Sequence, residues 1–201
     1  MKSSEDQLLD IGTCFGQDLR KLAYDGVNPA NLNGTDLIAG FEEAGFRLFN
    51  DRDRFANHFF ASDILSDDKE SPLVKREGKW NVLTAFLFLH VFSLSDCKIA
   101  CARMLRLTAG PGSWIMGVLL ASTEPGEGET GPPFAKEGET RKYHRHSRET
   151  FVEMWEDAAK NSGKKIDIWA EYAVEAMANP GSSFLNGPDA RKLWFFIEIL
   201  E

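Results

Sequence analysis

The sequence predicts an α/β fold in which a mostly parallel sheet has helices on both faces. Short, almost wholly apolar runs, typical of buried parallel strands, recur along the 201 residues. Between several of these runs, apolar residues repeat at helical spacing. Strands that alternate with helices indicate a parallel sheet. The length fits one compact domain, so we expect residues 1–201 to form a single unit.

The first half of the chain predicts four strands and two helices. We expect strands at residues 7–12, 31–37 and 57–65, and at 79–90 a fourth strand that runs into a buried turn. The first helix follows the first strand, where Leu19, Leu22 and Ala23 share one face. The second helix follows the second strand, and the residues expected on its apolar face are Phe41, Ala44, Gly45 and Leu48.

The second half predicts two more helices and three more strands. Helical spacing appears at Ile99, Ala102, Arg103 and Leu105, and a strand is expected at 113–122. Residues 123–145 contain Gly and Pro throughout, which favours a structureless segment, either a functional lid or disordered. A helix capped by Ser147 follows, and its apolar stripe is Phe151, Met154, Trp155 and Ala158. The last strands are expected at 164–174 and 191–200, joined by a loop at 179–189.

Composition excludes several classes of protein. The chain has 31 acidic and 23 basic residues, a net charge of -8, which disfavours nucleic acid and anionic membranes as partners. Cys14, Cys97 and Cys101 form no CxxC pair, so neither a disulfide framework nor a zinc site is expected. The polar N-terminal sequence is not a signal peptide, and the apolar run at 82–92 is too short to cross a bilayer. We therefore expect a cytoplasmic protein.

Polar residues at the ends of the predicted strands indicate a ligand site. In open parallel sheets, ligands bind beyond the carboxyl ends of the strands. Asp10, Gly12 and Gly16 flank the first turn, where glycine allows the backbone to approach a ligand closely. Asp36 follows Gly16 by about 20 residues, a spacing that suits a carboxylate bound to ribose hydroxyls. Asp63 ends the third strand.

The ligand is not expected to be a dinucleotide. The pattern G-x-G-x-x-G, begun at Gly12, requires glycine at Cys14 and Gln17. The phosphate-binding G-x-x-x-x-G-K-[ST] pattern is absent from the sequence as well. Asp10 would repel a pyrophosphate but would attract an amino or sulfonium group. Together these residues favour an adenosine ligand that carries positive charge.

These segments resemble the class I S-adenosylmethionine (SAM)-dependent methyltransferases. LLDIGTCFG resembles the first motif of that family, an acid followed by G-x-G-x-G. GTDL and ASDIL resemble the acidic ends of its second and third strands. FLFLHVF resembles the segment after strand four, and RHSRETFVEMWEDA a late helix of fungal members that modify polyketides and meroterpenoids. The resemblance implies a Rossmann-like sheet of seven strands whose last strand is antiparallel.

The resemblance also implies a role for each matching residue. SAM would be the cofactor, and the turn formed by Gly12, Thr13, Cys14 and Gly16 would line its methionine part, with Asp10 nearby. Asp36 would bind the two ribose hydroxyls, next to Leu37. Asp63 would accept from the adenine amino group, with Ile64 beside the ring. The backbone near Ala85 and Phe86 would meet the cofactor's own amino group.

Two departures from the family pattern bear on function. Cys14 stands where the family has its middle glycine. The first strand begins near residue 7, whereas the family has one or more helices before it, so we expect a missing N-terminal cap. Three readings remain open: a partner subunit, for instance a second copy, covers the site; the cofactor binds weakly; or the chain is a truncated form or a relative without methyl transfer.

The sequence therefore supports one leading function and two alternatives. The leading one is methyl transfer from SAM to an oxygen of a small apolar natural product in secondary metabolism. His90 is the candidate general base for a hydroxyl acceptor or, equally, a core histidine, and a carboxylate acceptor needs no base. His144 and His146 lack an acid or cysteine to complete a metal site. The alternatives are a cyclase or isomerase on the same fold and a non-catalytic interaction protein.

Overall fold

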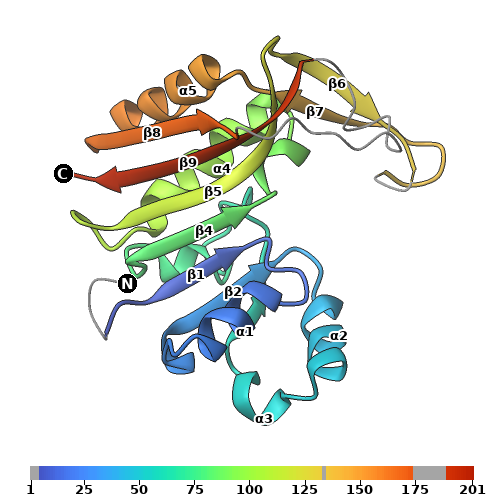
Figure 1. The fold of residues 1–201 in the computed structure, drawn as a ribbon, viewed down its shortest axis with the longest axis vertical. Coiled ribbons are helices and arrows are strands. Elements are labelled where there is room, and N and C mark those ends of the chain that lie inside the picture. The colour runs from blue at the N-terminus through green and yellow to red at the C-terminus, as the bar shows by residue number, and fades with distance from the viewer. Residues whose placement is uncertain (1–4, 133–134, 174–188) are drawn as a thin grey trace.

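The computed structural model describes residues 5–132, 135–173 and 189–201, which form a seven-stranded sheet with helices around it (Figure 1). The strands of this sheet are β1 (Leu8–Ile11), β2 (Leu32–Asp36), β3 (Phe59–Ala61), β4 (Val82–Phe86), β5 (Trp114–Ser122), β8 (Ile166–Tyr172) and β9 (Ala190–Ile199). The helices are α1 (Gln17–Tyr24), α2 (Gly40–Phe49), α3 (Arg52–Phe55), α4 (Leu94–Leu107) and α5 (Arg148–Asn161). Short 3-10 turns are η1 (Pro29–Asn31), η2 (Val74–Arg76) and η3 (Leu89–Val91).

The order of the strands confirms the predicted fold. It runs β3-β2-β1-β4-β5-β9-β8, and the pairs from β3 to β5 are parallel. β9, the last strand, lies between β5 and β8 and is antiparallel to both. Strand order reverses between β1 and β4, because the chain first builds outward through β2 and β3 and then returns. A reversal of this kind leaves a crevice at the carboxyl ends of the strands.

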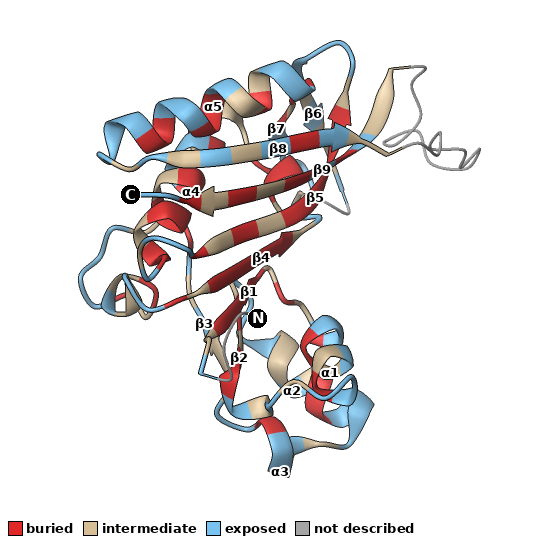
Figure 2. Cartoon of the chain, turned by 60° about the vertical axis from the view of Figure 1, so that its left-hand side comes forward, coloured by how far each residue is buried: buried red, intermediate tan, exposed pale blue. Residues whose placement is uncertain are grey.

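The sheet is packed on both faces, but by different helices. α4 and α5 pack against each other and against one face, where Leu9 and Ile11 belong to the larger apolar cluster. α1 covers the other face, where Leu8, Leu19 and Val82 belong to a second cluster (Figure 1). Figure 2 shows the buried residues concentrated on the central strands and the exposed residues on the outer side of α5. The alternation of Leu8 and Leu9 follows the two-residue period of a strand.

The helix after Ser147 is confirmed in detail. The Ser147 hydroxyl accepts from the backbone N–H of Thr150, and the Thr150 side chain accepts from the Ser147 N–H, which makes a capping box. All residues of the predicted stripe are buried, and they are Phe151, Met154, Trp155 and Ala158.

Two other helices bury faces that match the prediction only in part. In α4, Cys97, Cys101 and Met104 are fully buried, whereas Ile99 is 42% exposed because it lies two residues past Cys97, on the opposite side of the helix. Arg103 and Leu105 of the predicted set are buried, but the placement of Ile99 on the buried face was wrong. In α2, the predicted face included Leu48, which is 66% exposed. The buried residues of α2 include Phe46, whose ring packs edge-to-face on Phe59.

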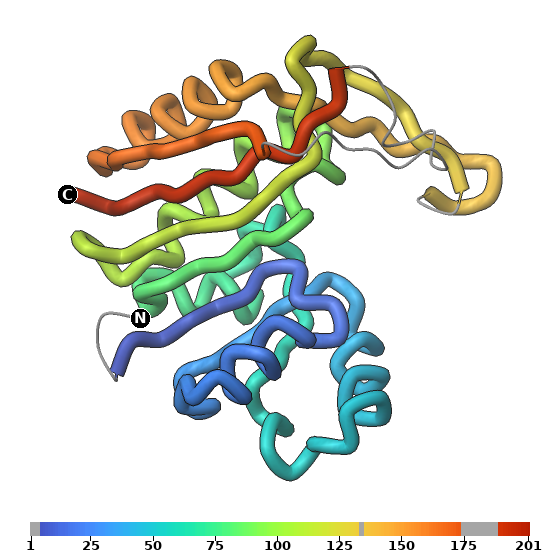
Figure 3. Tube along the Cα trace, in the orientation of Figure 1, coloured from blue at the N-terminus to red at the C-terminus, as the bar shows by residue number. Residues whose placement is uncertain are grey.

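The prediction of a structureless segment at 123–145 is wrong. Residues Gly126–Thr130 (β6) and Arg141–Arg145 (β7) form an antiparallel hairpin that projects beyond the carboxyl edge of the sheet (Figure 3). Gly128 faces the ring of Tyr143, which lies 2.5 Å from the position a Cβ would take, so this glycine makes room for a cross-strand partner. The hairpin is anchored to the residue that follows η3, where the His144 N–H donates to the Phe92 carbonyl at 2.8 Å.

Smaller differences concern the lengths of elements. β3 has three residues in place of the nine predicted, and the short helix α3 was not predicted. The strands expected at 164–174 and 191–200 are confirmed as β8 and β9. The loop predicted at 179–189 lies, except for Asp189, outside the described residues.

Candidate functional site

A cavity of about 250 Å³ opens at the carboxyl ends of β1, β2 and β3, where the strand order predicts a ligand site. Five residues singled out from the sequence line it: Gly12, Asp36, Leu37, Asp63 and Ile64. The structure thus brings together residues from the ends of three neighbouring strands. The other predicted residues lie outside the lining of this cavity and are described below.

The turn after β1 needs glycine at both of the positions that the sequence indicated. Gly12 and Gly16 have φ angles of 74° and 70°, in the left-handed region. A Cβ on Gly12 would lie 2.6 Å from the ring of Phe88, and one on Gly16 would lie 2.5 Å from the ring of Phe59. The backbone of this turn therefore runs directly against aromatic rings. The Gly12 N–H donates to the Thr35 carbonyl at 2.9 Å, which fastens the turn to β2.

Cys14, which replaces the family's middle glycine, is also left-handed. Its φ of 50° costs about 1 kcal/mol or more for a residue with a side chain. Its thiol is half-buried, and burial raises the thiol's pKa, so it is protonated at neutral pH. Thr13, the neighbouring residue, is buried and lines a narrow crevice with Cys14 beside β2 and β3.

Asp36 holds this turn through its carboxylate. Oδ2 accepts from the backbone N–H of Cys14 at 3.0 Å, and Oδ1 accepts from the N–H of Ile38 at 3.1 Å. Each carboxylate oxygen has a second lone pair. Because Asp36 lines the cavity, those lone pairs are available to hydroxyl donors of a ligand.

Asp63 and Ile64 form a polar edge beside an apolar wall. Asp63 is exposed, and its Oδ1 accepts from the Leu65 N–H at 2.9 Å. Ile64 and Leu73 are buried and line the cavity next to it. A flat apolar ring that carries an amino group is the kind of ligand that suits this arrangement.

Asp10 lies away from the first cavity. It is buried in a second cavity, of about 420 Å³, between α1 and the sheet, with Phe86 and Trp114 among its walls. The Thr84 hydroxyl donates to Asp10 Oδ1 at 2.7 Å. Burial raises the pKa of Asp10 to about 6, despite this hydrogen bond. Ala85, the neighbour of Phe86, is fully buried in the main core.

His90 is a buried residue of η3. Its backbone carbonyl accepts from Arg145 Nη1 at 3.2 Å, and its ring Nδ1 has no hydrogen-bond partner within the described residues. Burial, reinforced by the Arg145 charge, lowers the pKa of His90 to about 4, so the imidazole is neutral at pH 7. The next residues, Val91 and Phe92, line the first cavity, whereas His90 does not.

The other histidines of this region link the hairpin to α5. The rings of His144 and His146 lie 4.4 Å apart, and His146 Nδ1 lies 3.2 Å from the Thr150 hydroxyl. Burial is the main cause that lowers the pKa of His146, to about 4. Within the described part of the chain, no three His, Cys, Asp or Glu side chains are grouped so as to hold a metal ion. No described helix is long and apolar enough to cross a membrane.

Sequence reasoning missed several residues of the cavity. Leu87 and Phe88 line it from the turn that follows β4, which ends at Phe86. The sequence predicted that this strand runs into a buried turn, but nothing in it marks Leu87, whose φ is 52°, as the position of that turn. Arg141 reaches the cavity from the unpredicted hairpin.

The fold is that of SAM-dependent methyltransferases. A SAM-dependent methyltransferase from Methanosarcina mazei aligns with 99% of this chain and 95% of its own at a TM-score of 0.64 and 15% identity. The N-terminal domain of EvdMO1, solved with S-adenosylhomocysteine (SAH) and D-fucose, aligns with 98% of this chain and 76% of its own at a TM-score of 0.66 and 9% identity. At such identities the likeness shows the fold alone. No protein-family model matches the chain.

In sequence, the chain is similar to fungal natural-product methyltransferases, as its motifs predicted. It is 35% identical over 186 residues to O-methyltransferase atr3 of Stereocaulon alpinum, a match that covers 92% of this chain and 50% of that protein. It is 34% identical over 178 residues to methyltransferase adrK of Penicillium roqueforti, which covers 87% and 62% respectively. The chain thus spans between half and 62% of the length of these relatives.

Proposed function

We propose that the chain carries out SAM-dependent methyl transfer to an oxygen of a small apolar natural product in secondary metabolism. The observation that carries the proposal is the cavity at the carboxyl ends of β1 to β3, where Gly12, Asp36 and Asp63 converge. The similarity to fungal methyltransferases supports both the reaction and the class of substrate. The net charge of -8 supports a small-molecule acceptor in preference to nucleic acid.

The residues present fit the cofactor. Asp36 would bind the ribose hydroxyls with the lone pairs that face the cavity, and Leu37 lies beside it. Asp63 would accept from the adenine amino group, with Ile64 against the ring. The left-handed turn at Gly12 presents bare backbone to the methionine part. We assign Thr13, Cys14 and Gly16 to the same turn.

Three other residues predicted to contact the cofactor do not line the cavity: Asp10, Ala85 and Phe86. Asp10 would act through the field of its carboxylate, since its side chain faces α1. The backbone at Ala85 and Phe86 would lead into the turn at Leu87, which lines the cavity.

When bound, SAM would supply an activated methyl group, on a sulfonium, for transfer to an acceptor oxygen, with SAH as the other product. The protein's contribution is to align the two reactants and to keep water out. We propose His90 as the catalytic general base for a hydroxyl acceptor: it does not line the cavity, but it directly precedes Val91, which does, and its imidazole is neutral at pH 7. Its low pKa makes it a weak base, so it would contribute modestly. A carboxylate acceptor requires no base.

The mouth of the cavity is apolar, and we propose that a second copy of the chain covers it. Leu37, Ile38 and Leu87 line the cavity and are each more than half exposed. Apolar side chains grouped around a site favour a partner or an apolar substrate. Leu37→Asp should convert a dimer to a monomer in sedimentation, whereas a wild-type chain that sediments as a monomer at high concentration would end this part of the proposal.

We also propose that residues 1–201 fold as a single domain and that the protein works in the cytoplasm. The cytoplasmic setting rests on the three cysteines, which are all free.

A second function is favoured by Cys14. A cysteine in left-handed conformation places a side chain in the turn where the family has a bare backbone. That change motivates a protein of this fold that catalyses a cyclisation or isomerisation, or that only binds a partner. Neither alternative needs the methyl group of SAM.

Methyl transfer from labelled SAM separates these functions. The chain would be incubated with methyl-labelled SAM and a panel of apolar phenols and carboxylic acids, and label would be counted in the organic extract. We expect labelled product and an equal amount of SAH with the wild type, and none with Asp36→Ala. Asp25→Ala, an exposed acid paired with Lys21, is the matched control and should remain active. Binding of SAM without label transfer to any acceptor would favour the second function.

A further inference from the structure

The wall of the cavity beside Asp63 is formed by a segment with little regular structure. Residues 62–77 connect β3 to β4 and contain only the short turn η2. Ser62, Asp63, Ile64 and Leu73 of this segment line the cavity. The Ser62 N–H donates to the Asp36 carbonyl at 2.9 Å, and the other backbone N–H bonds of the segment close turns within it. Beyond Ser62, side-chain contacts must therefore contribute to the position of the segment.

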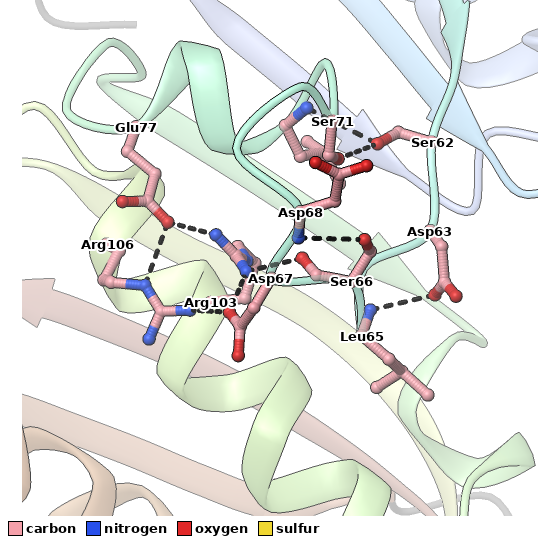
Figure 4. A network of polar contacts seen from close by, with 11 residues as sticks. Ser62, Asp63, Leu65, Ser66, Asp67, Asp68, Ser71, Glu77, Arg103 and Arg106 are labelled. Carbon is pink, nitrogen blue, oxygen red and sulfur yellow. Dashed lines mark hydrogen bonds and ion pairs between the residues drawn. The ribbon is translucent and has the colours of Figure 1, made fainter.

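A buried arginine on α4 supplies those contacts. The Arg103 side chain is 1% exposed, and its guanidinium donates to the Ser66 carbonyl at 2.6 Å and to the carboxylates of Asp67 and Glu77 (Figure 4). Ser66 and Asp67 stand at one end of the segment and Glu77 at the other. One planar group with several donors therefore bridges the two ends.

The segment carries this restraint inward to the cavity. The hydroxyls of Ser62 and Ser71 lie 3.0 Å apart (Figure 4). The Leu73 N–H donates to Ser62 Oγ at 3.4 Å. Leu73 is fully buried and forms part of the cavity wall. The Arg103 guanidinium thus binds residues of the segment that do not line the cavity, Ser66, Asp67 and Glu77. Ser62 and Leu73 of the same segment do line it.

We infer that Arg103 is a positioning residue that sets the place of Asp63 and Ile64 and thereby the recognition of the adenine end of the ligand. The inference rests on the proposed function for the identity of that ligand. Arg103 touches no ligand itself. Its side chain acts through the segment at 62–77.

Arg106 provides a matched control on the same helix. It contacts the same two acids, with Nε 2.9 Å from Glu77 Oε1 and Nη2 3.3 Å from Asp67 Oδ1. Its side chain is 39% exposed, however, and it lacks the contact with the Ser66 carbonyl. Loss of a partly exposed ion pair costs little. Arg103→Met and Arg106→Met therefore remove the same charge from the same acids but only the first releases the loop.

Hydrogen exchange of the ligand-free protein tests the restraint directly. In Arg103→Met, amides of residues 62–77 should exchange at least tenfold faster than in wild type, while those of β4 and β5 stay unchanged. Arg106→Met should leave the exchange rates of both sets of amides, those of residues 62–77 and those of β4 and β5, near the wild-type rates. Arg103→Lys, which keeps the charge, serves if the methionine variant fails to fold, and it should give an intermediate rate because one ammonium cannot span both ends. Equal acceleration throughout the protein, or none at 62–77, would overturn the inference.

Calorimetric titration then tests whether Arg103 affects recognition of the adenine amino group. Wild type should bind SAH more tightly than S-inosylhomocysteine, which lacks the adenine amino group, and Arg103→Met should lose most of that preference. Asp63→Ala should lose it too, and the double variant should be no worse than Asp63→Ala alone. Equal weakening of both ligands by Arg103→Met, or fully additive losses in the double variant, would refute a positioning role. If wild type binds neither ligand, the proposed function fails, and the exchange rates alone decide whether Arg103 holds the loop.

Discussion

Asp36 offers the sharpest test of how the turn after β1 is held. Asp36→Ala removes two hydrogen bonds from backbone N–H groups, those of Cys14 and Ile38, to a charged acceptor. Hydrogen bonds to charged groups contribute about 1.5–3 kcal/mol each, with the lower figure for partly exposed ones. Two bonds at the lower figure give a loss of about 3 kcal/mol in the free energy of unfolding.

Urea unfolding at pH 7 measures this loss. Asp36→Asn keeps one acceptor oxygen and should lose about half as much, and Asp25→Ala should lose under about 1 kcal/mol because its ion pair with Lys21 is exposed. All variants should share one m-value, since none changes the surface exposed on unfolding. If Asp36→Ala unfolds within 0.5 kcal/mol of wild type, about the scatter of surface substitutions, then Asp36 does not hold the turn and our account of the turn is wrong.

Other predictions concern strain and burial. Gly12→Ala should destabilise by more than Gly26→Ala in urea unfolding, because both have positive φ but only Gly12 faces the Phe88 ring, at 2.6 Å; equal losses would exclude the collision. Asp10→Asn should be more stable than wild type at pH 7, by up to about 3 kcal/mol, since its folded pKa is raised from 3.8 to about 6. The advantage should shrink as the pH falls below 6 and vanish below about pH 3, where Asp10 is neutral in both the folded and the unfolded state; an advantage independent of pH would contradict the raised pKa. Ser147→Ala removes the side-chain cap of α5 and should lower the free energy of unfolding by about 1 kcal/mol, measured by thermal unfolding. An unchanged free energy of unfolding would show that the capping box does not stabilise the helix.

Much of the fold followed from local patterns. α5 was predicted closely because a capping residue and a stripe at helical spacing act within one helix. The order of the seven sheet strands along the chain was correct because apolar runs mark buried strands. The hairpin β6–β7 was missed because Gly and Pro suggest a loop, whereas Gly128 makes room for the ring of Tyr143.

The site residues that could be predicted from the sequence are those that lie at or just after the end of a strand. Gly12, Asp36 and Asp63 were found because each follows a strand, and the parallel arrangement brings them to one cavity. Phe88 and Arg103 were not, since their importance depends on contacts with residues far away in the sequence. The face that α4 buries was predicted only in part: Leu105 is buried as expected, whereas Ile99 is apolar but 42% exposed.

Calorimetric titration of the purified chain with SAM and SAH tests the central claim most directly. We predict that both ligands bind with micromolar dissociation constants, about -8 kcal/mol, and that Asp36→Ala abolishes the heat of both. Absence of binding by either ligand at millimolar concentration, from a chain shown to be folded, would contradict a SAM site in this cavity.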